Sequence, residues 1–267
     1  MPYADLRDLR IYYENKGNGP RLLYIGGTGG DLRQAPNVFD GPLARAFDIL
    51  AYDQRGMGRT GGPKRDYTMA DYAEDAAALA AHLGWENYAV MGFSFGGMVA
   101  QELAIRYPRR IKRLLLCCTS SGGVGGSSFP MHELQDLPIV ERAAKLVALG
   151  DIRRDETWQK ANSAMFRSLV EFTVYMISER EKEPEARAGA RRQLEARKGH
   201  NTWERLPQLE MPVLICGGEH DGISPPENLN ALAERIPEAE ILFFDGGHLF
   251  HLQDAKAYEA MIGFLAQ

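Results

Sequence analysis

The sequence has few cysteines and no excess of basic residues. Its 267 residues include three cysteines, Cys117, Cys118 and Cys216. An odd number with two adjacent members does not favour a disulfide framework, and no pair has the spacing of a zinc site. Lysine and arginine total 31 against 36 aspartates and glutamates, which gives a net charge of −5. Proteins that bind nucleic acids usually carry a basic excess, so we expect no nucleic-acid partner.

Long apolar runs are also missing. No run of 18 apolar residues is present to span a bilayer, and the first 19 residues lack the apolar centre of a signal peptide. We therefore expect no membrane association and a cytoplasmic location. Hydrophobic residues make up 45% of the chain and charged residues 25%, which is ordinary for a soluble globular protein. A chain of this length can fold without a disulfide or a structural metal. The sequence gives no indication of the oligomeric state.

Short apolar runs alternate with helical patterns along much of the chain. The predicted strands are 9–14, 21–25, 47–52, 88–91, 111–118, 212–216 and 240–244. The predicted helices between and after them are 68–83, 96–107, 226–235 and 255–265. The strands at 21–25, 47–52 and 88–91 show little alternation, as expected of strands buried on both faces. The rhythm favours a mostly parallel sheet flanked by helices on both faces, an α/β fold.

The alternation is interrupted after a Ser/Gly-rich turn at 120–128. From 131 to about 203 the patterns are helical only. The sequence therefore predicts a core domain formed by residues 1–125 and 206–267, with a helical cap inserted at 126–205. Residues 179–198 are rich in charge and have few apolar positions. We expect a solvated helical face there rather than a binding patch.

A serine lies on a glycine-rich turn between a predicted strand and a predicted helix. The turn reads Gly92-Phe93-Ser94-Phe95-Gly96. In this context the Gly-x-Ser-x-Gly pattern places the serine on a sharp, strained turn, and the small residues let the neighbouring segments approach closely. The helix that follows favours negative charge near its start. We predict that Ser94 is a nucleophile. The alternative is a glycine-rich turn with an incidental serine.

A serine nucleophile needs a base that a carboxylate orients. His248 follows the last predicted strand through two glycines, and loops at strand ends are where binding groups collect in α/β sheets. We therefore predict His248 as the base, with His251, three residues on, as the main competitor.

Carboxylates follow the strand at 212–216. Glu219 and Asp221 are both candidates for the acid, and Asp221 is favoured because Gly222 and the Pro225-Pro226 pair fix a tight loop around it. Asp245 is nearer to the predicted base in sequence, but it closes a turn and we expect it to be structural. Ser94, Asp221 and His248 then follow one another in the order expected for this arrangement on an α/β sheet.

With these motifs the sequence resembles the α/β-hydrolase-fold serine hydrolases over nearly its whole length. The motifs that carry the resemblance are the elbow at Ser94, the Asp53-x-Arg55-Gly56-x-Gly58 turn, Asp221 before its proline turn, and Gly247-His248. Within the family, the run from Gly92 to Gln101 and the compact lid are most similar to bacterial enol-lactonase-like and small carboxylesterase-like members. The resemblance implies that the turn at Asp53 is structural.

The resemblance also implies an oxyanion hole of two backbone N–H groups. One belongs to the residue after the nucleophile, Phe95, and the other to the glycine-rich loop Gly26 to Gly30. Many relatives have His-Gly at the start of that loop, whereas this chain has Gly26-Gly27. The register then implies Thr28 as the second donor.

Substrate contacts are less specified. Arg33, just past the loop, could bind a carboxylate on the substrate. Trp158 and Trp203 in the insertion could line an acyl pocket or belong to the cap's own core. Cys117 and Cys118 end a strand, and we expect buried, inert thiols.

The predicted function is a serine hydrolase, with no cofactor and no metal, that cleaves a small-molecule ester or lactone through an acyl-enzyme on Ser94. A serine in place of an aspartate argues against the dehalogenase and epoxide-hydrolase branches of this fold. Other reactions use the same triad, and a thioesterase, a C–C bond hydrolase, an aminopeptidase or a perhydrolase remain alternatives. A ligand-sensing protein of the same fold with slow turnover is an alternative from another class.

Overall fold

The computed structural model describes residues 2–182 and 184–267. Its centre is an eight-stranded sheet with the order β1-β2-β4-β3-β5-β6-β7-β8. The pairs β1–β2 and β2–β4 are antiparallel, and every other pair is parallel. The strands are β1 (Tyr3–Leu6), β2 (Leu9–Lys16), β3 (Arg21–Ile25), β4 (Asp48–Tyr52), β5 (Tyr88–Phe93), β6 (Ile111–Cys117), β7 (Val213–Gly218) and β8 (Glu240–Phe244).

Helices connect the parallel strands. They are α1 (Leu43–Ala46), α2 (Met69–His82), α3 (Phe95–Arg106), α4 (Ile139–Leu149), α5 (Glu156–Ala161), α6 (Ser163–Arg180), α7 (Pro184–Lys198), α8 (Pro226–Arg235), α9 (Phe250–Gln253) and α10 (Lys256–Leu265). The start of α2 shows how the local sequence fixes a helix end. Thr68 Oγ1 accepts a hydrogen bond from the Asp71 N–H at 3.1 Å, and an Asp71 carboxylate oxygen accepts one from the Thr68 N–H at 3.0 Å. This capping box fixes the helix start that the sequence indicated.

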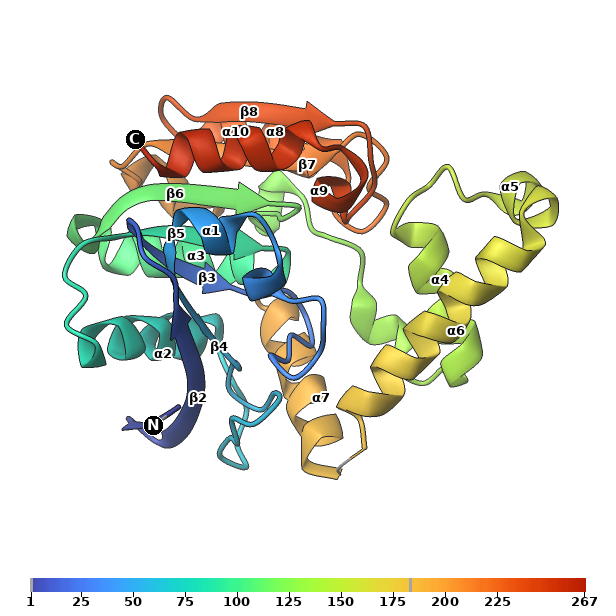
Figure 1. Ribbon diagram of the computed structural model, residues 1–267, viewed down its shortest axis with the longest axis horizontal. Coiled ribbons are helices and arrows are strands. Elements are labelled where there is room, and N and C mark those ends of the chain that lie inside the picture. Colours follow the sequence, from blue (N-terminus) through green and yellow to red (C-terminus); the bar gives the residue numbers. More distant parts are fainter. Residues whose placement is uncertain (1, 183) are drawn as a thin grey trace.

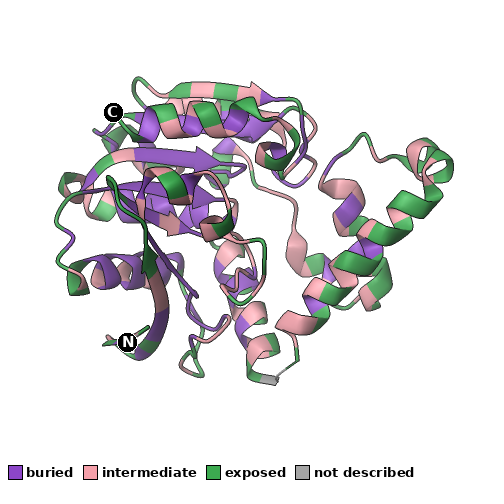
Figure 2. Cartoon of the chain, viewed as in Figure 1, coloured by how far each residue is buried: buried purple, intermediate pink, exposed green. Residues whose placement is uncertain are grey.

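The sheet is buried on both faces, so neighbouring strand residues point into different core layers. Leu23 and Leu50 pack with α2, α3 and α8 on one face, whereas Leu22 and Ile49 pack with α1 and α10 on the other. Figure 2 shows the buried residues concentrated in the sheet and in the helices that cover it. The predicted mostly parallel sheet between two helical layers is thus observed.

Helices α4 to α7 fall between β6 and β7 in the chain. In Figure 1, α4, α5 and α6 project beyond the end of the sheet to which the parallel strands point, and α7 runs back toward it. The projecting helices have a small core of their own, built on Ala143, Val147, Val170 and Ile177. We call the chain from α4 to α7 the cap. No helix of the described residues is long and apolar enough to cross a bilayer.

The solvated face expected at 179–198 is present on α7, where Arg187, Arg191 and Glu195 are exposed, but the helix also has a buried face that the sequence did not indicate. Gln193, Leu194 and Ala196 are buried, and a Cβ on Gly189 would lie 1.9 Å from the carbonyl oxygen of Gly56. The helix therefore packs closely on the core. Its buried surface includes a glycine and a polar amide, which a count of apolar positions overlooks.

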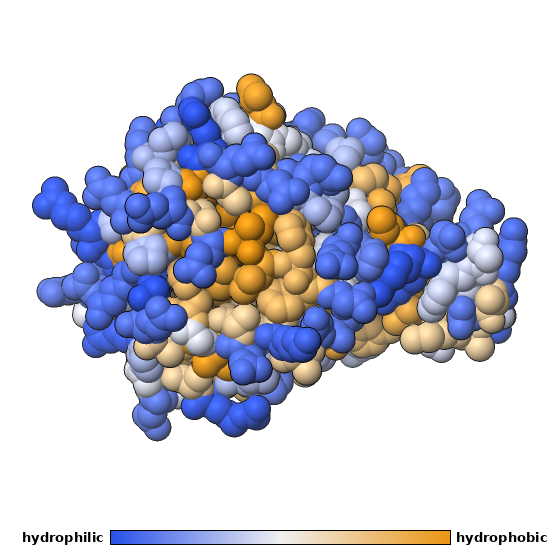
Figure 3. Space-filling model, turned by 90° about the horizontal axis from the view of Figure 1, so that it is seen from above, coloured by the Kyte–Doolittle hydropathy of each residue, from blue (hydrophilic) through white to orange (hydrophobic). Residues whose placement is uncertain are grey.

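The edge strand β8 carries the most exposed apolar side chains of the sheet. Leu242 is 39% exposed, and Ile241 and Phe243 are partly buried. Seen from above, apolar side chains gather over β8 and α10 (Figure 3).

Candidate active site

Ser94 lies at the junction of β5 and α3 in strained backbone. Its φ is 55° and its ψ is −116°, a combination that side-chain-bearing residues seldom adopt. Every other residue from Tyr88 to Ala104 is buried, whereas Ser94 is partly exposed. The Ser94 N–H donates to the carbonyl oxygen of Cys117 at 2.8 Å, which ties the turn to the end of β6. The turn thus presents this one hydroxyl at the carboxyl edge of the sheet.

The two glycines of the turn are required by close approach. A Cβ on Gly96 would lie 2.0 Å from the carbonyl oxygen of Ile25, and one on Gly92 would lie 2.4 Å from that of Gly96. Both distances are far below van der Waals contact, so any side chain would push α3 away from β3 and β5. The Gly-x-Ser-x-Gly pattern therefore has a packing cause here.

Asp221 and His248 are joined at the same edge of the sheet. Asp221 follows β7, and one of its carboxylate oxygens, Oδ2, lies 2.7 Å from His248 Nδ1. The other, Oδ1, accepts the N–H groups of Ile223 at 2.7 Å and Ser224 at 3.0 Å. The side chain of Asp221 is fully buried, and that of His248 is 12% exposed. The aspartate is therefore fixed on one side by the backbone and directs its second oxygen at the imidazole.

The ring of His248 lies beside the serine turn. Its centroid is 5.5 Å from that of Phe93, the residue before Ser94. The His248 N–H also donates to the carbonyl oxygen of Gly150 at 2.7 Å, so the loop that carries this histidine is held by the end of α4. The three predicted triad residues are brought to one region of the molecule from loops after β5, β7 and β8.

The competing residues lie elsewhere or lack a partner. Glu219 is exposed, and Asp245 is 73% exposed and forms an ion pair with Arg153 at 2.6 Å. The ring of His251 packs against that of Phe93 at 5.1 Å, and its Nδ1 is buried with no hydrogen-bond partner in the described residues. Burial lowers the pKa of His251 to about 4, with the neighbouring His248 contributing. Among the described residues, no carboxylate orients His251 as Asp221 orients His248.

Cys118 is a neighbour of this pair that the sequence reasoning took only as a buried thiol. It adopts φ 49°, and its Sγ donates to the carbonyl oxygen of His248 at 3.2 Å. One donor atom from each of Cys118, Asp221 and His248 lies within 4.8 Å of the others. A metal there would need the thiolate, whereas burial raises the pKa of the Cys118 thiol well above its usual range. The predicted burial of Cys117 and Cys118 is confirmed, and Cys216 is buried as well.

The glycine-rich loop runs beside the serine. A Cβ on Gly27 would lie 3.5 Å from the Cβ of Ser94. The Gly30 N–H donates to the carbonyl oxygen of Gly27 at 3.1 Å, and Gly29 has φ 71°, so 27–30 is a turn with a left-handed third residue. Thr28, the implied oxyanion donor, is the second residue of this turn. Phe95, the other implied donor, is the first residue of α3, where N–H groups have no partner within the helix.

Two cap side chains form hydrogen bonds with this turn, and neither was predicted from the sequence. The Gly29 N–H donates to Gln193 Oε1 at 2.8 Å. Arg180 Nη1 donates to the carbonyl oxygens of Thr28 at 3.5 Å and Gly29 at 3.4 Å. The peptide between Thr28 and Gly29 is thus held at both its N–H and its C=O. Because the partners lie more than 150 residues away, only the folded cap could identify them.

The turn that begins at Asp53 has a structural role. One carboxylate oxygen of Asp53 accepts the Leu32 N–H at 2.7 Å and the other accepts the Arg59 N–H at 2.8 Å. Burial raises the pKa of Asp53 to about 6. This carboxyl holds the loop beyond the glycine-rich turn and does not contact Ser94.

The three predicted substrate contacts lie apart from one another. The guanidinium of Arg33 is paired with Asp31 at 2.6 Å and borders a cavity of about 450 Å³ beside Arg180. Trp158 is on α5, at the tip of the cap (Figure 1). Trp203 packs against the core, with the Arg235 guanidinium 5.3 Å from its ring. Their roles as substrate contacts stay predictions.

Comparisons with known proteins place this architecture in context. The sequence model of the family described as alpha/beta hydrolase fold matches residues 20–255. A poly(3-hydroxyalkanoate) depolymerase of Ectopseudomonas oleovorans is 28% identical over 254 residues, which covers 90% of this chain and 82% of that protein. A putative carbamate hydrolase of Azorhizobium caulinodans is 26% identical and covers 100% of this chain and 99% of that protein.

Solved structures show the same fold. The crystal structure of the enol-lactonase from Burkholderia xenovorans LB400 superposes with a TM-score of 0.79 at 24% sequence identity, over 100% of both chains. At this identity the likeness bears on the fold alone. The fold class predicted from the sequence is confirmed.

Proposed function

The chain belongs to the α/β-hydrolase fold family, and from that premise we propose that it is a serine hydrolase that cleaves a small carboxylic ester or lactone. The observation that carries the proposal is the hydrogen bond of 2.7 Å between Asp221 and His248, next to a serine held in strained backbone. A buried carboxylate that orients an imidazole beside a presented hydroxyl is the arrangement that activates a serine nucleophile.

In the proposed reaction, Ser94 Oγ attacks the carbonyl carbon of the substrate. His248 Nε2 takes the hydroxyl proton as the new C–O bond forms, and Asp221 stabilises the resulting imidazolium. The tetrahedral intermediate then collapses, the alkoxide leaves with the proton from His248, and an acyl-enzyme on Ser94 remains. Water, deprotonated by the same histidine, attacks the acyl carbonyl and releases the acid and the free serine.

The oxyanion of each tetrahedral intermediate is assigned to the N–H groups of Phe95 and Thr28. The partial positive charge at the start of α3 adds to the first of these donors. The second depends on the orientation of the turn at 27–30, which Gln193 and Arg180 hold. Donors fixed before the reaction need no reorganisation when the charge develops, and this preorganisation is the main source of their effect.

The name of one relative supports an acyl substrate. The depolymerase acts on a poly(3-hydroxyalkanoate), and this name describes a carbonyl joined to an alkoxide-type oxygen. For this chain we propose the same bond type in a small molecule, with the cap selecting the acyl and alcohol parts.

A panel of esters and lactones tests the proposal. Purified protein is incubated with p-nitrophenyl esters of increasing acyl length and with a series of lactones, beside the Ser94→Ala variant. Turnover by the wild-type protein that the variant lacks is the expected result. Binding of these compounds without turnover would favour the ligand-sensing alternative, and equal turnover by the variant would remove Ser94 from the mechanism.

A further inference from the structure

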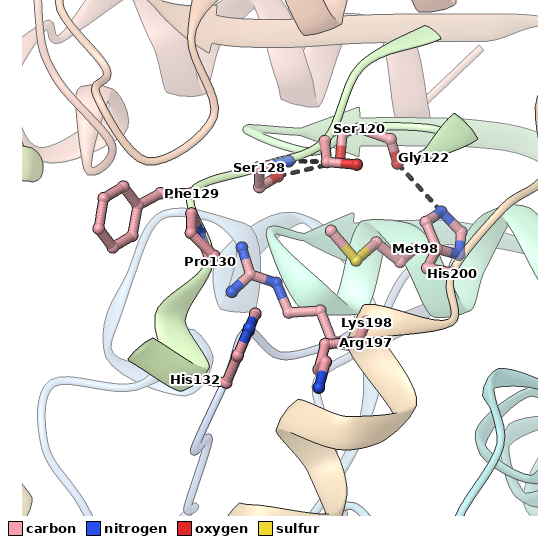
Figure 4. A pocket seen from close by; sticks show the side chains of 11 residues that line it. Met98, Ser120, Gly122, Ser128, Phe129, Pro130, His132, Arg197, Lys198 and His200 are labelled. Atoms are coloured by element: carbon pink, nitrogen blue, oxygen red, sulfur yellow. Dashed lines mark hydrogen bonds between the residues drawn. The ribbon is translucent and has the colours of Figure 1, made fainter. Parts of the chain in front are cut away.

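A second cavity lies on the α3 side of the sheet, between the cap and the core. Its volume is about 160 Å³, and it is bounded by α3 at Met98, by the segment after β6 and by the end of α7 (Figure 4). Arg197, His132 and His200 contribute to its lining, together with serines of the segment after β6. None of the described residues that line it is an aspartate or a glutamate. The cavity is therefore cationic and rich in hydrogen-bond donors.

Arg197 has no counter-ion in this cavity. Its guanidinium extends from the end of α7 toward Ser128 and Pro130 and lies beside His132 (Figure 4). Within the described part of the chain it forms no ion pair and no hydrogen bond. Burial lowers the pKa of Arg197 to about 10, and no carboxylate offsets this effect. A partly buried cation without a partner costs stability that a bound anion would restore.

The lining also includes the basic residues Lys198 and His200. Lys198, the next residue, pairs with Glu195 at 3.3 Å and is 48% exposed, so its charge is directed outward. His200 is 6% exposed, and its Nδ1 has no hydrogen-bond partner in the described residues. Arg197 thus faces a cavity wall on which no negative group competes for it.

Hydrogen bonds connect this cavity to the proposed active site. Ser128 Oγ donates to Ser224 Oγ at 3.4 Å, and the Ser224 N–H donates to Asp221 at 3.0 Å. Met98 lies one helical turn after Ser94 in α3, and its N–H donates to the Ser94 carbonyl oxygen at 3.3 Å. An occupant of the cavity would therefore contact the scaffold of the triad from outside it.

We propose that this cavity is a binding site for a small oxyanion, a carboxylate or phosphate group, held by the Arg197 guanidinium and the His132 imidazole. Arginine suits such groups because its planar fork offers two parallel N–H donors to two oxygens. Serines of the segment after β6 form the polar wall opposite these two side chains. The proposal does not depend on hydrolysis at Ser94.

Binding of inorganic phosphate and of acetate tests the proposal directly. Isothermal titration and thermal denaturation are measured against sodium chloride at equal ionic strength, for the wild-type protein and for Arg197→Gln. We expect both anions to bind the wild-type protein and to raise its melting temperature. Loss of the charge-assisted pair should weaken binding in Arg197→Gln by at least about tenfold.

Matched variants separate this result from general charge effects. Arg191→Gln changes an exposed arginine of the same helix, which pairs with Asp136 at the surface, and should bind as the wild type does. Arg197→Lys keeps the charge and should bind with intermediate affinity, which provides a readout if the glutamine variant fails to fold. Ser94→Ala should bind phosphate like the wild-type protein, so failure of the proposed hydrolase leaves this test intact.

Inhibition experiments identify the source of the oxyanion. If the group belongs to the substrate, phosphate will compete with an anionic ester such as p-nitrophenyl hemisuccinate but not with p-nitrophenyl acetate. If it belongs to a separate ligand, phosphate will compete with neither ester. Both patterns require the binding above. Equal affinity of the wild-type protein and Arg197→Gln for both anions, or no effect beyond that of chloride, would overturn the proposal.

Discussion

Replacing Asp221 by asparagine tests the hydrogen bond on which the proposed function rests. Oδ1 of Asp221 accepts two backbone N–H groups, and Oδ2 faces His248 Nδ1 at 2.7 Å. In Asp221→Asn the amide oxygen must stay on the backbone donors, because an NH₂ group there would meet two N–H groups. The NH₂ group then faces Nδ1, which has to accept a hydrogen bond. The proton moves to Nε2, and the imidazole can no longer take the proton of Ser94.

The expected effect is large and falls on kcat. An inverted tautomer in a serine triad lowers kcat by about 10⁴-fold. This factor corresponds to about 5 kcal/mol of activation free energy, at 1.36 kcal/mol for each tenfold. The substitution conserves volume and keeps both backbone hydrogen bonds, so the fold should persist. Steady-state hydrolysis of p-nitrophenyl acetate measures the first effect, and thermal denaturation checks the second.

The matched control is Asp245→Asn. This aspartate follows β8, as His248 does, but it is 73% exposed and pairs with Arg153 and His220 rather than with His248. Its kcat should stay within about twofold of the wild-type value, since exposed ion pairs contribute little. A folded Asp221→Asn protein whose kcat lies within tenfold of the wild type would refute the reasoning, because His248 would then not depend on Asp221 for its tautomer.

Three further predictions concern residues around the site. His251→Phe should keep activity and should lose less stability than the wild type between pH 6.5 and 4, because this histidine binds a proton at a higher pH in the unfolded chain than in the folded one. Denaturation at pH 7 and 4.5 measures the change in the free energy of unfolding, and an equal change in both proteins would contradict the prediction. Gly96→Ala should destabilise the fold by about 1–3 kcal/mol or more. The control Gly263→Ala should be neutral or stabilising, because no atom lies within 4 Å of the added Cβ. Equal urea midpoints for the two variants would argue against the close approach of Gly96 to Ile25. Gln193→Leu should lower kcat by about tenfold with little change in KM, because the Gly29 N–H loses its acceptor; a change in KM alone would assign Gln193 to substrate binding.

The sheet was predictable because short contiguous runs of apolar residues indicate most of its strands. The strands at 21–25 and 240–244 and the helix at 226–235 have the bounds that the sequence predicted. β1 (Tyr3–Leu6) was not predicted, since four residues give a weak pattern and the strand is defined by its antiparallel pairing with β2. Local propensity contains no information on such a partner.

The serine turn was also predictable, because its glycines and its strand–helix context are contiguous in the sequence. The hydrogen bonds of Gln193 and Arg180 to the glycine-rich turn could not be predicted from the sequence. Those side chains belong to a charged stretch whose pattern resembles a solvated face, and hydrogen bonds rather than apolar contacts hold them against the core. The sequence also did not indicate that Arg197 lacks a counter-ion, since only the lining of the folded cavity shows that none of its described residues is a carboxylate.

Mass spectrometry of the protein quenched during turnover tests the central claim most directly. The protein is mixed with p-nitrophenyl butyrate, quenched in acid within the first turnovers, and digested. A butyryl group on the peptide that contains Ser94, absent when His248 is replaced by alanine, is the predicted result. A butyryl group on a different residue, or full turnover with unmodified Ser94 at every time point, would contradict the proposed acyl-enzyme.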